Sequence, residues 1–447
     1  MSVNRLFRAP APAAALLLRG AHALDPRAGL DAAHDVLVRD GAIAEIGAPG
    51  SLVAPEGAET IAGEGLHLFP GFFDPHVHLR TPGQEHKETL ASGTAAAAAG
   101  GYCGVVAMPN TSPTLDSAPL LRALIEQAER EARVPVGFMP AITRGLAGAE
   151  LTDMAELRDA GALGFTDDGR PVVAAGMLRR ALQYQRLCGG VLALHEEDPS
   201  LSGTGVMHEG EVSARLGMAG IPSISESTMV ARDAAIAAFE AGRVHFQHLS
   251  CVESVEALAA WKAAGAQVSG EASPHHLTLT DETVRSLDSR FKMNPPLRGE
   301  ADRQALIAGL RDGTIDCVAT DHAPHARHEK ETPFEEAPMG VTGLETAFPV
   351  LYTDLVLPGV LPLPLLVERM TAGAALLDLG RPRIAIGEPA NLALLDLEAS
   401  WEVGARGYAS KSANSCFEGR ALRGVVRLTI AAGAVVHRVD AAVEAAA

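Results

Sequence analysis

The sequence predicts an α/β protein: a (β/α)8 TIM barrel with a small β domain formed from the N- and C-terminal segments. Eight apolar, strand-like runs alternate with helix-like stretches over roughly 250 residues, which is the size and rhythm of such a barrel. Both ends of the chain instead carry short strand-like runs separated by turn signals. With 447 residues, the chain is long enough for both units. We expect the small domain in residues 1–69 and 376–447 and the barrel in residues 70–375.

The small β domain is predicted from the two ends of the chain. Asp40-Gly41 separates the apolar runs 36–38 and 42–47, which is a strong hairpin signal. Similar strand-like runs return at residues 391–396 and 425–430, so we expect the two ends to pair. The apolar run 13–18 faintly resembles a signal peptide, but Arg19 ends it early. We therefore expect a first strand here, preceded by a short disordered leader.

The barrel is predicted from its alternating segments. The expected strands are residues 72–78, 104–108, 134–140, 162–166, 191–195, 244–248, 266–270 and 316–320. The expected helices include residues 118–132, 174–187, 227–241, 252–264 and 303–312. A doubly wound open sheet is the main alternative, but no G-x-G-x-x-G follows the first strand.

Composition narrows the range of partners and compartments. The formal charge of −18 argues against nucleic acid or an anionic membrane surface as a partner. An anionic substrate would need local positive charge from a metal or from particular arginines. The five cysteines are widely spaced and odd in number, which is typical of reduced residues in a cytoplasmic protein. No apolar run reaches the length of a transmembrane helix.

Residue types that bind metals follow five of the eight expected strands. Side chains alternate along a strand, so His76, His78 and Arg80 project to one side. Other strands end in Asp167-Asp168, in His195-Glu196-Glu197, in His248 and in the run 321–325, and Asn110 follows the second strand. Catalytic groups of these barrels lie at the carboxyl ends of the strands. Histidines and carboxylates together suit zinc or a related ion, and a carboxylate could bridge two ions.

Several nearby residues have a structural alternative. His245 lies three positions before His248, so we expect it to pack outside the barrel. Only one of Asp167 and Asp168 can face the centre, because adjacent strand residues point oppositely. Glu196 and Glu197 are expected to support His195 rather than to bind metal. His275 and His276 fit loop structure better than a metal role.

Six sequence motifs carry a family resemblance. They are HVHLR at 76–80, MPNT at 108–111, GFTDDG at 164–169, PHHL at 274–277, KMNPPLR at 292–298 and ATDHAPH at 319–325. Together these motifs resemble type I bacterial dihydroorotases of the amidohydrolase superfamily, over most of the chain to about residue 350. The resemblance implies reversible cyclisation of N-carbamoyl-L-aspartate to L-dihydroorotate in pyrimidine biosynthesis, by a metal-activated hydroxide.

The resemblance also implies site residues. One Zn²⁺ would be bound by His76, His78 and Asp321, a second by His195 and His248, and Asp168 would bridge them. Asp321 would act as general base and then as general acid. The substrate would be held by His78, Arg80, Asn110, Asn294, His325, Met339 and Gly340. Many relatives carry a phenylalanine before the glycine at 340, where this chain has Met339.

The lysines separate this chain from other relatives. Hydantoinases and some dihydroorotases bridge their metals with a carboxylated lysine on strand four. Here the only lysines are Lys87, Lys262, Lys292, Lys330 and Lys411, and none is near that strand. A carboxylate must therefore bridge, and Asp168 is the candidate.

Two alternatives to an active dihydroorotase stay open on sequence grounds. The chain could be an allantoinase-like or hydantoinase-like amidohydrolase, or an inactive homologue that acts as a structural partner of aspartate transcarbamoylase. Aspartate transcarbamoylase is also a candidate partner if the protein is active, and we expect a homo-oligomer.

The charged segment 326–338 could be a mobile lid or an ordinary surface loop.

Overall fold

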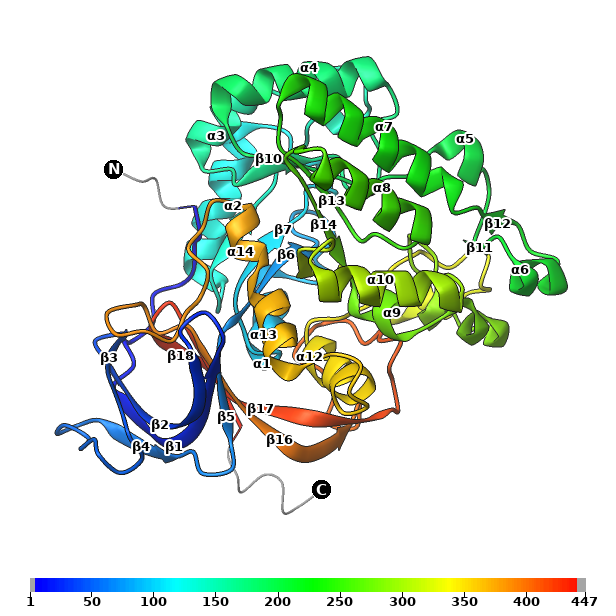
Figure 1. Ribbon diagram of the computed structural model, residues 1–447. Helices are drawn as coiled ribbons and strands as arrows, with labels where there is room; N and C mark the ends of the chain where they lie inside the picture. The colour runs from blue at the N-terminus through cyan, green and yellow to red at the C-terminus, as the bar shows by residue number, and fades with distance from the viewer. Residues whose placement is uncertain (1–4, 440–447) are drawn as a thin grey trace.

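A closed barrel of eight parallel strands forms the centre of the molecule. The computed structural model describes residues 5–439, and Figure 1 shows the barrel strands enclosed by helices. The barrel strands are β6 (Phe72–Val77), β7 (Tyr102–Ala107), β8 (Val136–Phe138), β9 (Gly164–Thr166), β10 (Val191–Leu194), β13 (Val244–Phe246), β14 (Val268–Ala272) and β15 (Cys317–Val318). Each strand lies within or close to one of the eight predicted runs, so the strand prediction is confirmed.

Backbone hydrogen bonds close the barrel. Strands β6, β7 and β8 pair in one parallel set, and β9, β10, β13, β14 and β15 pair in a second. The amide of Leu163 donates to the carbonyl of Phe138 at 3.0 Å, which joins β8 to β9. The amide of His78 donates to the carbonyl of His322 at 2.8 Å, which joins β6 to the chain after β15. The carboxyl ends of all eight strands therefore surround one mouth.

A helix follows each barrel strand before the next begins. These helices are α1 (Leu90–Ala99), α2 (Ala118–Glu131), α3 (Met154–Ala160), α4 (Ala175–Cys188), α7 (Ile224–Glu240), α8 (Val252–Ala263), α10 (Glu300–Asp312) and α13 (Leu363–Thr371). Shorter elements decorate the loops: α5 (Pro199–Ser202), α6 (Glu211–Leu216), α9 (Pro274–Thr278), α11 (Arg327–Lys330), α12 (Ala347–Leu351), α14 (Gly373–Leu376), and the strands β11 (Met207–His208) and β12 (Gly220–Ile221). The five predicted helices are all present.

The two ends of the chain form one mixed sheet beside the barrel. Its order is β18-β17-β16-β5-β1-β2-β3, and β4 also pairs with β1. The strands are β1 (Leu16–Asp25), β2 (Leu30–Arg39), β3 (Ala42–Gly47), β4 (Glu59–Ala62), β5 (His67–Pro70), β16 (Leu392–Glu402), β17 (Ala421–Ala431) and β18 (Ala434–Arg438). The two ends meet where β16 runs antiparallel to β5, as the strand patterns predicted. Asp40 and Gly41 both have positive φ, which is typical of the predicted tight hairpin.

The segment before β1 differs from the expected disordered leader. Residues 1–4 lie outside the described residues, but Phe7 exchanges two backbone hydrogen bonds with Val136 of β8, at 2.9 and 2.8 Å. Phe7 is also buried in the main core. An apolar side chain that can reach the barrel therefore orders this part of the leader.

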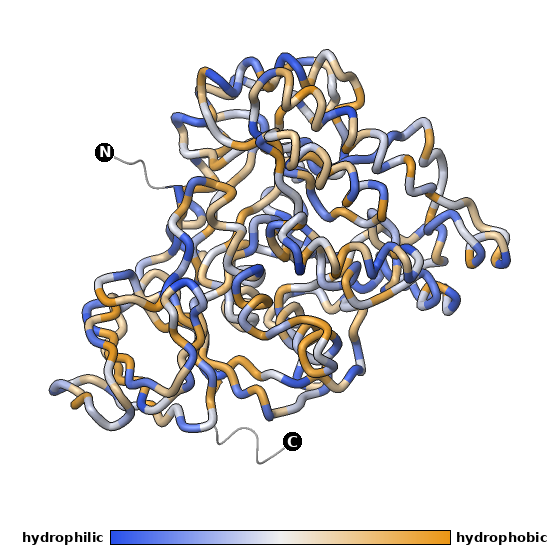
Figure 2. The backbone as a smooth tube through the Cα atoms, in the orientation of Figure 1, coloured by the Kyte–Doolittle hydropathy of each residue, from blue (hydrophilic) through white to orange (hydrophobic). Residues whose placement is uncertain are grey.

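The hydrophobic core runs from the barrel into the small sheet. In Figure 2 the chain around α12 is hydrophobic, and it lies between the barrel and β16–β17 in Figure 1. Phe348 of α12 packs on Phe69 of β5 and Phe72 of β6, with ring centroids 5.6 and 5.4 Å apart. Within residues 5–439, no helix combines the length and apolar character needed to cross a bilayer.

Candidate metal centre

The six predicted metal ligands meet at the mouth of the barrel. His76 lies in β6 and His78 directly after it, and Nε2 of His78 lies 2.9 Å from Oδ1 of Asp321. Nε2 of His76 lies 3.4 Å from Oδ1 of Asp168 and 3.4 Å from Oδ1 of Asp321. Ligand atoms about 2.0–2.2 Å from a tetrahedral ion lie about 3.3–3.6 Å apart. Most of these spacings therefore fit ligands around a common ion.

His76 gives the clearest test of whether a cation fits. It is fully buried, and its Nε2 makes no hydrogen bond with any described residue. Its Nδ1 lies 2.6 Å from Oε1 of Glu271, so this carboxylate accepts the Nδ1 proton and leaves Nε2 facing the two aspartates, where a metal ion could take the place of the Nε2 proton. A buried imidazole nitrogen with no hydrogen-bond partner, beside two carboxylates, is a strong cation ligand set. The residues present fit a divalent metal.

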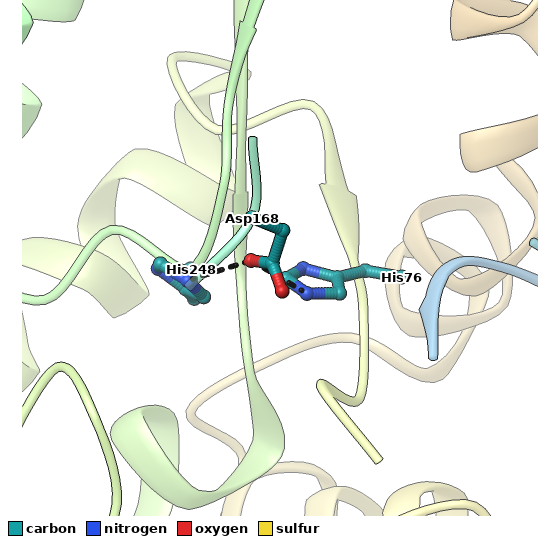
Figure 3. A group of neighbouring side chains, drawn as sticks. All are labelled: His76, Asp168 and His248. Atoms are coloured by element: carbon teal, nitrogen blue, oxygen red, sulfur yellow. Dashed lines mark ion pairs between the residues drawn. The ribbon is translucent and has the colours of Figure 1, made fainter. Parts of the chain in front are cut away.

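A second ligand set shares Asp168. Nδ1 of His195 and Nε2 of His248 lie 2.9 Å apart, and they lie 3.9 and 3.8 Å from Oδ1 of Asp168. Figure 3 shows the Asp168 carboxylate between the imidazoles of His76 and His248. Asp168 therefore lies between both histidine pairs, where a bridging carboxylate would have to be.

The carboxylates next to the predicted ligands, Asp167, Glu196 and Glu197, take the roles predicted from the alternation of strand side chains, with one exception. Asp167 turns away from Asp168 and accepts hydrogen bonds from the backbone amide and hydroxyl of Thr143. Glu197 supports His195, since its Oε2 lies 3.3 Å from Nε2 of that ring. Glu196 does not support His195 as expected. It packs beside Asp233 and Arg232 instead, because adjacent side chains point in opposite directions.

The predicted substrate residues surround the same mouth. Arg80 donates from Nε to the carbonyl of Pro324 at 3.1 Å and places Nη2 3.4 Å from Nε2 of His325. Nε2 of His325 is also 2.8 Å from the carbonyl of Met339, so this nitrogen carries the proton and donates it. Asn110 joins Nδ1 of His78 to Asp168, through Oδ1 at 2.8 Å and Nδ2 at 3.2 Å.

A cavity of about 220 Å³ connects these groups. Its lining includes every predicted site residue except His76, which is completely buried: His78, Arg80, Asn110, Asp168, His195, His248, Asn294, Asp321, His325, Met339 and Gly340. Nδ2 of Asn294 donates to Oε2 of Glu197 at 2.6 Å. The cavity is smaller than the roughly 300 Å³ at the lower end of drug-sized pockets, so it suits a small substrate.

The expectation that His245 packs outside the barrel is wrong. His245 is buried, and its Nε2 lies 3.0 Å from Oε2 of Glu271, the carboxylate that also holds His76. His248 has a φ of +32°, so the regular alternation of the strand breaks before this residue. Counting back from His248 therefore assigns the wrong face to His245.

Two other histidines near the mouth, His276 and His322, have structural contacts. His276 lies in the short helix α9 and not in a loop, but it contacts Ser273 and the carbonyl of Pro295, which fits a structural role. His322 faces Glu88 at 3.4 Å and accepts from the amide of Gly343. His322 thus points away from its neighbour Asp321, which faces the centre.

Sequence reasoning missed two residues that hold the site together. Glu271 lies just beyond the predicted seventh strand, and a charged residue within a buried strand was the signal that could have revealed it. Asn414 contacts the loop of His325 from the distant connection between β16 and β17. No local pattern in the sequence marks Asn414.

Opposite charges set the protonation of the centre. Burial would raise the pKa of Asp168 and of Asp321, but the imidazoles around them, His76 foremost, outweigh it and hold both pKa values below the usual range. Burial raises and His76 lowers the pKa of Glu271, with a net value of about 2. Burial and the Arg80 charge lower the pKa of His325 to about 2. The carboxylates are therefore ionised and His325 is neutral at pH 7.

Known proteins resemble the chain over nearly its full length. A family model described as "Dihydro-orotase-like" matches residues 65–257. A dihydroorotase of Geobacter sp. (strain M21) is 45% identical, covering 95% of this chain and 99% of that protein. One of Pelotomaculum thermopropionicum is 44% identical, covering 94% and 98%.

Solved structures show the same architecture. An L-hydantoinase (dihydropyrimidinase) from Arthrobacter aurescens superposes with a TM-score of 0.84 at 26% identity, covering 95% of this chain and 96% of that one. A D-hydantoinase (dihydropyrimidinase) from Thermus sp. gives a TM-score of 0.80 at 25% identity, covering 95% of each chain.

The barrel, the cluster of predicted metal ligands and the similar proteins together identify the chain as a metal-dependent cyclic amidohydrolase. Its sequence relatives are closer in identity than the hydantoinase structures, and they cover nearly all of both chains. The chain belongs to the dihydroorotase family.

Proposed function

We propose that the protein interconverts N-carbamoyl-L-aspartate and L-dihydroorotate by forming and breaking a cyclic amide bond. The observation that carries this proposal is that Arg80 borders the same cavity as the predicted ligands. An arginine fork binds a carboxylate with two parallel hydrogen bonds, and dihydroorotate carries a carboxylate. Arg80 is buried, so such a pair would be shielded from water.

The hydantoinase alternative is less well supported. In a hydantoinase we would expect a carboxylated lysine on the fourth barrel strand to bridge the two metals. Here that strand is β9, which is followed by Asp168, and no lysine occurs between Lys87 and Lys262. Hydantoins without a carboxylate would also leave the Arg80 charge without a partner. Both points favour dihydroorotate as the substrate.

We propose two Zn²⁺ ions per chain. His76, His78 and Asp321 would hold one, His195 and His248 the other, and Asp168 both. When bound, such ions lower the pKa of a water molecule and polarise a carbonyl. Glu271, Asn110 and Glu197 would orient His76, His78 and His195, because each contacts one of these rings.

The chain's own residues would bind the substrate and move the proton. Arg80 would pair with the substrate carboxylate, with Asn110, Asn294 and His325 beside it. In hydrolysis, Asp321 would accept a proton from the attacking water and deliver it to the ring nitrogen as the bond from carbonyl carbon to nitrogen breaks. Its low pKa keeps it ionised at pH 7, so it carries no proton of its own before the reaction. Cyclisation follows the same path in reverse.

Turnover of dihydroorotate tests the proposal directly. Metal content and activity would be measured before chelation, after chelation and after zinc is returned. We expect two zinc ions per chain and activity that falls and recovers with them. Activity that persists in a fully demetallated sample would refute the metal role, and turnover of hydantoin but not dihydroorotate would refute the substrate.

Adjacent aspartates provide a matched test of the bridge. Asp168→Asn should lose both metals, whereas Asp167→Asn, which removes a carboxylate facing Thr143, should keep them. Asp321→Ala should lower kcat by several orders of magnitude in a folded protein. Arg80→Lys should instead raise KM about tenfold or more. An unchanged KM would argue against the carboxylate pair.

Partners and location are further proposals from the family resemblance. We propose a homo-oligomer that acts in the cytoplasm, in keeping with five free cysteines, and aspartate transcarbamoylase as a partner. Light scattering of the purified protein, alone and mixed with that enzyme, tests both assemblies.

A further inference from the structure

The connection between β16 and β17 reaches from the small sheet to the mouth of the barrel. It spans residues 403–420, and Asn414 within it is only 4% exposed. Asn414 is far in sequence from every predicted site residue. It nevertheless lies against two loops that line the substrate cavity.

Every hydrogen-bonding group of the Asn414 side chain is used. Its Oδ1 accepts from the amide of His325 at 3.0 Å. Its Nδ2 donates to the carbonyl of Ala323 at 3.2 Å and to the carbonyl of Gly340 at 3.1 Å. One N–H and two carbonyls surround the amide, so its orientation is fixed: oxygen must face the N–H and nitrogen the carbonyls.

The two loops that Asn414 joins are also tightly fitted to each other. Gly340 has a φ of +126°, and a Cβ there would come within 2.8 Å of Cβ of Ala323. His325 in one loop donates to the carbonyl of Met339 in the other. A small movement of either loop would therefore displace His325, and with it the Arg80 side chain that it contacts.

The connection is itself anchored beside the loop that follows Arg80. Glu88 in that loop accepts from the hydroxyl of Ser410 and from the amide of Lys411. The hydroxyl of Ser412 donates to the carbonyl of Lys87 at 2.7 Å. Asn414 is thus held on a fixed support and not on a free loop.

We propose that Asn414 is a positioning residue for substrate binding, acting through His325 and Gly340. This inference rests on the proposed function, because it assigns those two residues to the substrate site. Asn414 lines the cavity behind His325 but not the cavity that contains the predicted ligands. Its loss should therefore weaken substrate binding and leave the metals in place.

The first test is kinetic. Asn414→Ala should raise KM for dihydroorotate about tenfold, with kcat within about threefold of wild type and zinc content unchanged. The matched control is Asn391→Ala. Asn391 directly precedes β16, and its side chain accepts a hydrogen bond from the amide of Ala432, which directly follows β17 in the small sheet. This control should keep KM within twofold. Equal KM in Asn414→Ala and wild type, or a fall in kcat with loss of zinc at unchanged KM, would overturn the proposal.

The second test needs no substrate. Amide hydrogen exchange of peptides covering 322–328 and 339–343 should be at least tenfold faster in Asn414→Ala and unchanged in Asn391→Ala. Unchanged exchange in both peptides would overturn the proposal even if the protein proved to act on another substrate. If Asn414→Ala does not fold, Asn414→Asp replaces it, because Asp keeps the acceptor for His325 and loses both donors.

Discussion

Glu271 links the metal centre to the interior of the barrel. One of its oxygens faces His76 and the other faces His245, whose Nδ1 lies 2.9 Å from the hydroxyl of Ser269. Cys317 lies close to His245 and Glu271, so these three residues could in principle bind a metal ion. However, both oxygens of Glu271 already contact imidazoles. We therefore interpret Glu271 and His245 as residues that orient His76, and not as part of a separate metal site.

Replacing Glu271 should weaken metal binding. Glu271→Gln keeps the shape but gives a weaker acceptor for the His76 proton, and loss of such outer partners typically costs about 10–100-fold in metal affinity. Competition with a chromogenic chelator measures that affinity. Glu345→Gln is the matched control, since Glu345 is a half-buried carboxylate that accepts from the amide of Ala409 away from the ligands. Equal affinities in the two variants would contradict this role.

Asp167 should make stability depend on pH. Burial raises its pKa from 3.8 to about 6, so the folded chain keeps a proton that the unfolded chain releases. Its contribution is fully present below about pH 4 and is lost as pH rises through 6. Two pKa units correspond to about 3 kcal/mol.

Denaturant unfolding of wild type and Asp167→Asn across pH 4–7 measures this effect. The free energy of unfolding of wild type relative to the variant should fall by about 2.5 kcal/mol over that range. A constant difference would show that Asp167 is ionised throughout.

The segment 326–338 is held in place by two lysines. Nζ of Lys330 donates to the carbonyls of Ser289, Lys292 and Pro338 at 2.9, 3.1 and 2.8 Å. Nζ of Lys292 donates to the carbonyl of Phe334 at 2.7 Å. Of the two interpretations left open by the sequence, these contacts favour a fixed surface loop.

Removing one lysine should release this loop. Lys330→Met leaves three carbonyls without their donor, each at a cost of about 1–3 kcal/mol where it stays buried. Limited proteolysis should cut within 326–338 in this variant and not in wild type, with or without substrate. Lys262→Met is the control, because Lys262 contacts Gly313 and Asp316 elsewhere. Cleavage of wild type that substrate suppresses would instead identify a lid.

Elements with strong local patterns could be predicted from the sequence. The barrel strands are short apolar runs, and the amphipathic α2 and α4 repeat with helical spacing. Helix α1 is different: Leu90–Ala99 is largely alanine and buried on most sides, so no periodicity marks it. The predicted ligands could be identified because each lies at or just beyond the carboxyl end of a strand, whereas Asn414 meets the site only through tertiary packing.

The small sheet and the barrel share one aromatic cluster. Phe348 stacks on Phe72 of the barrel and on Tyr352, and it also contacts Phe69 of the small sheet. A Cβ on Gly424 of β17 would come within 3.2 Å of the Phe348 ring. The sequence shows each aromatic residue but not their meeting, since β5, α12 and β17 are far apart along the chain.

Because of this shared core, the whole molecule should unfold in one transition. Phe348→Ala removes a fully buried ring, at a cost of about 3–5 kcal/mol. Calorimetry should show one transition at a lower Tm, with the signals of both regions lost together. Phe239→Ala is the control, because Phe239 is 76% exposed and its loss should leave Tm almost unchanged. Two separate transitions in Phe348→Ala would mean that the small sheet and the barrel fold independently. Because Asn414 lies in the connection between β16 and β17 of the small sheet, the mouth of the barrel could then form without it.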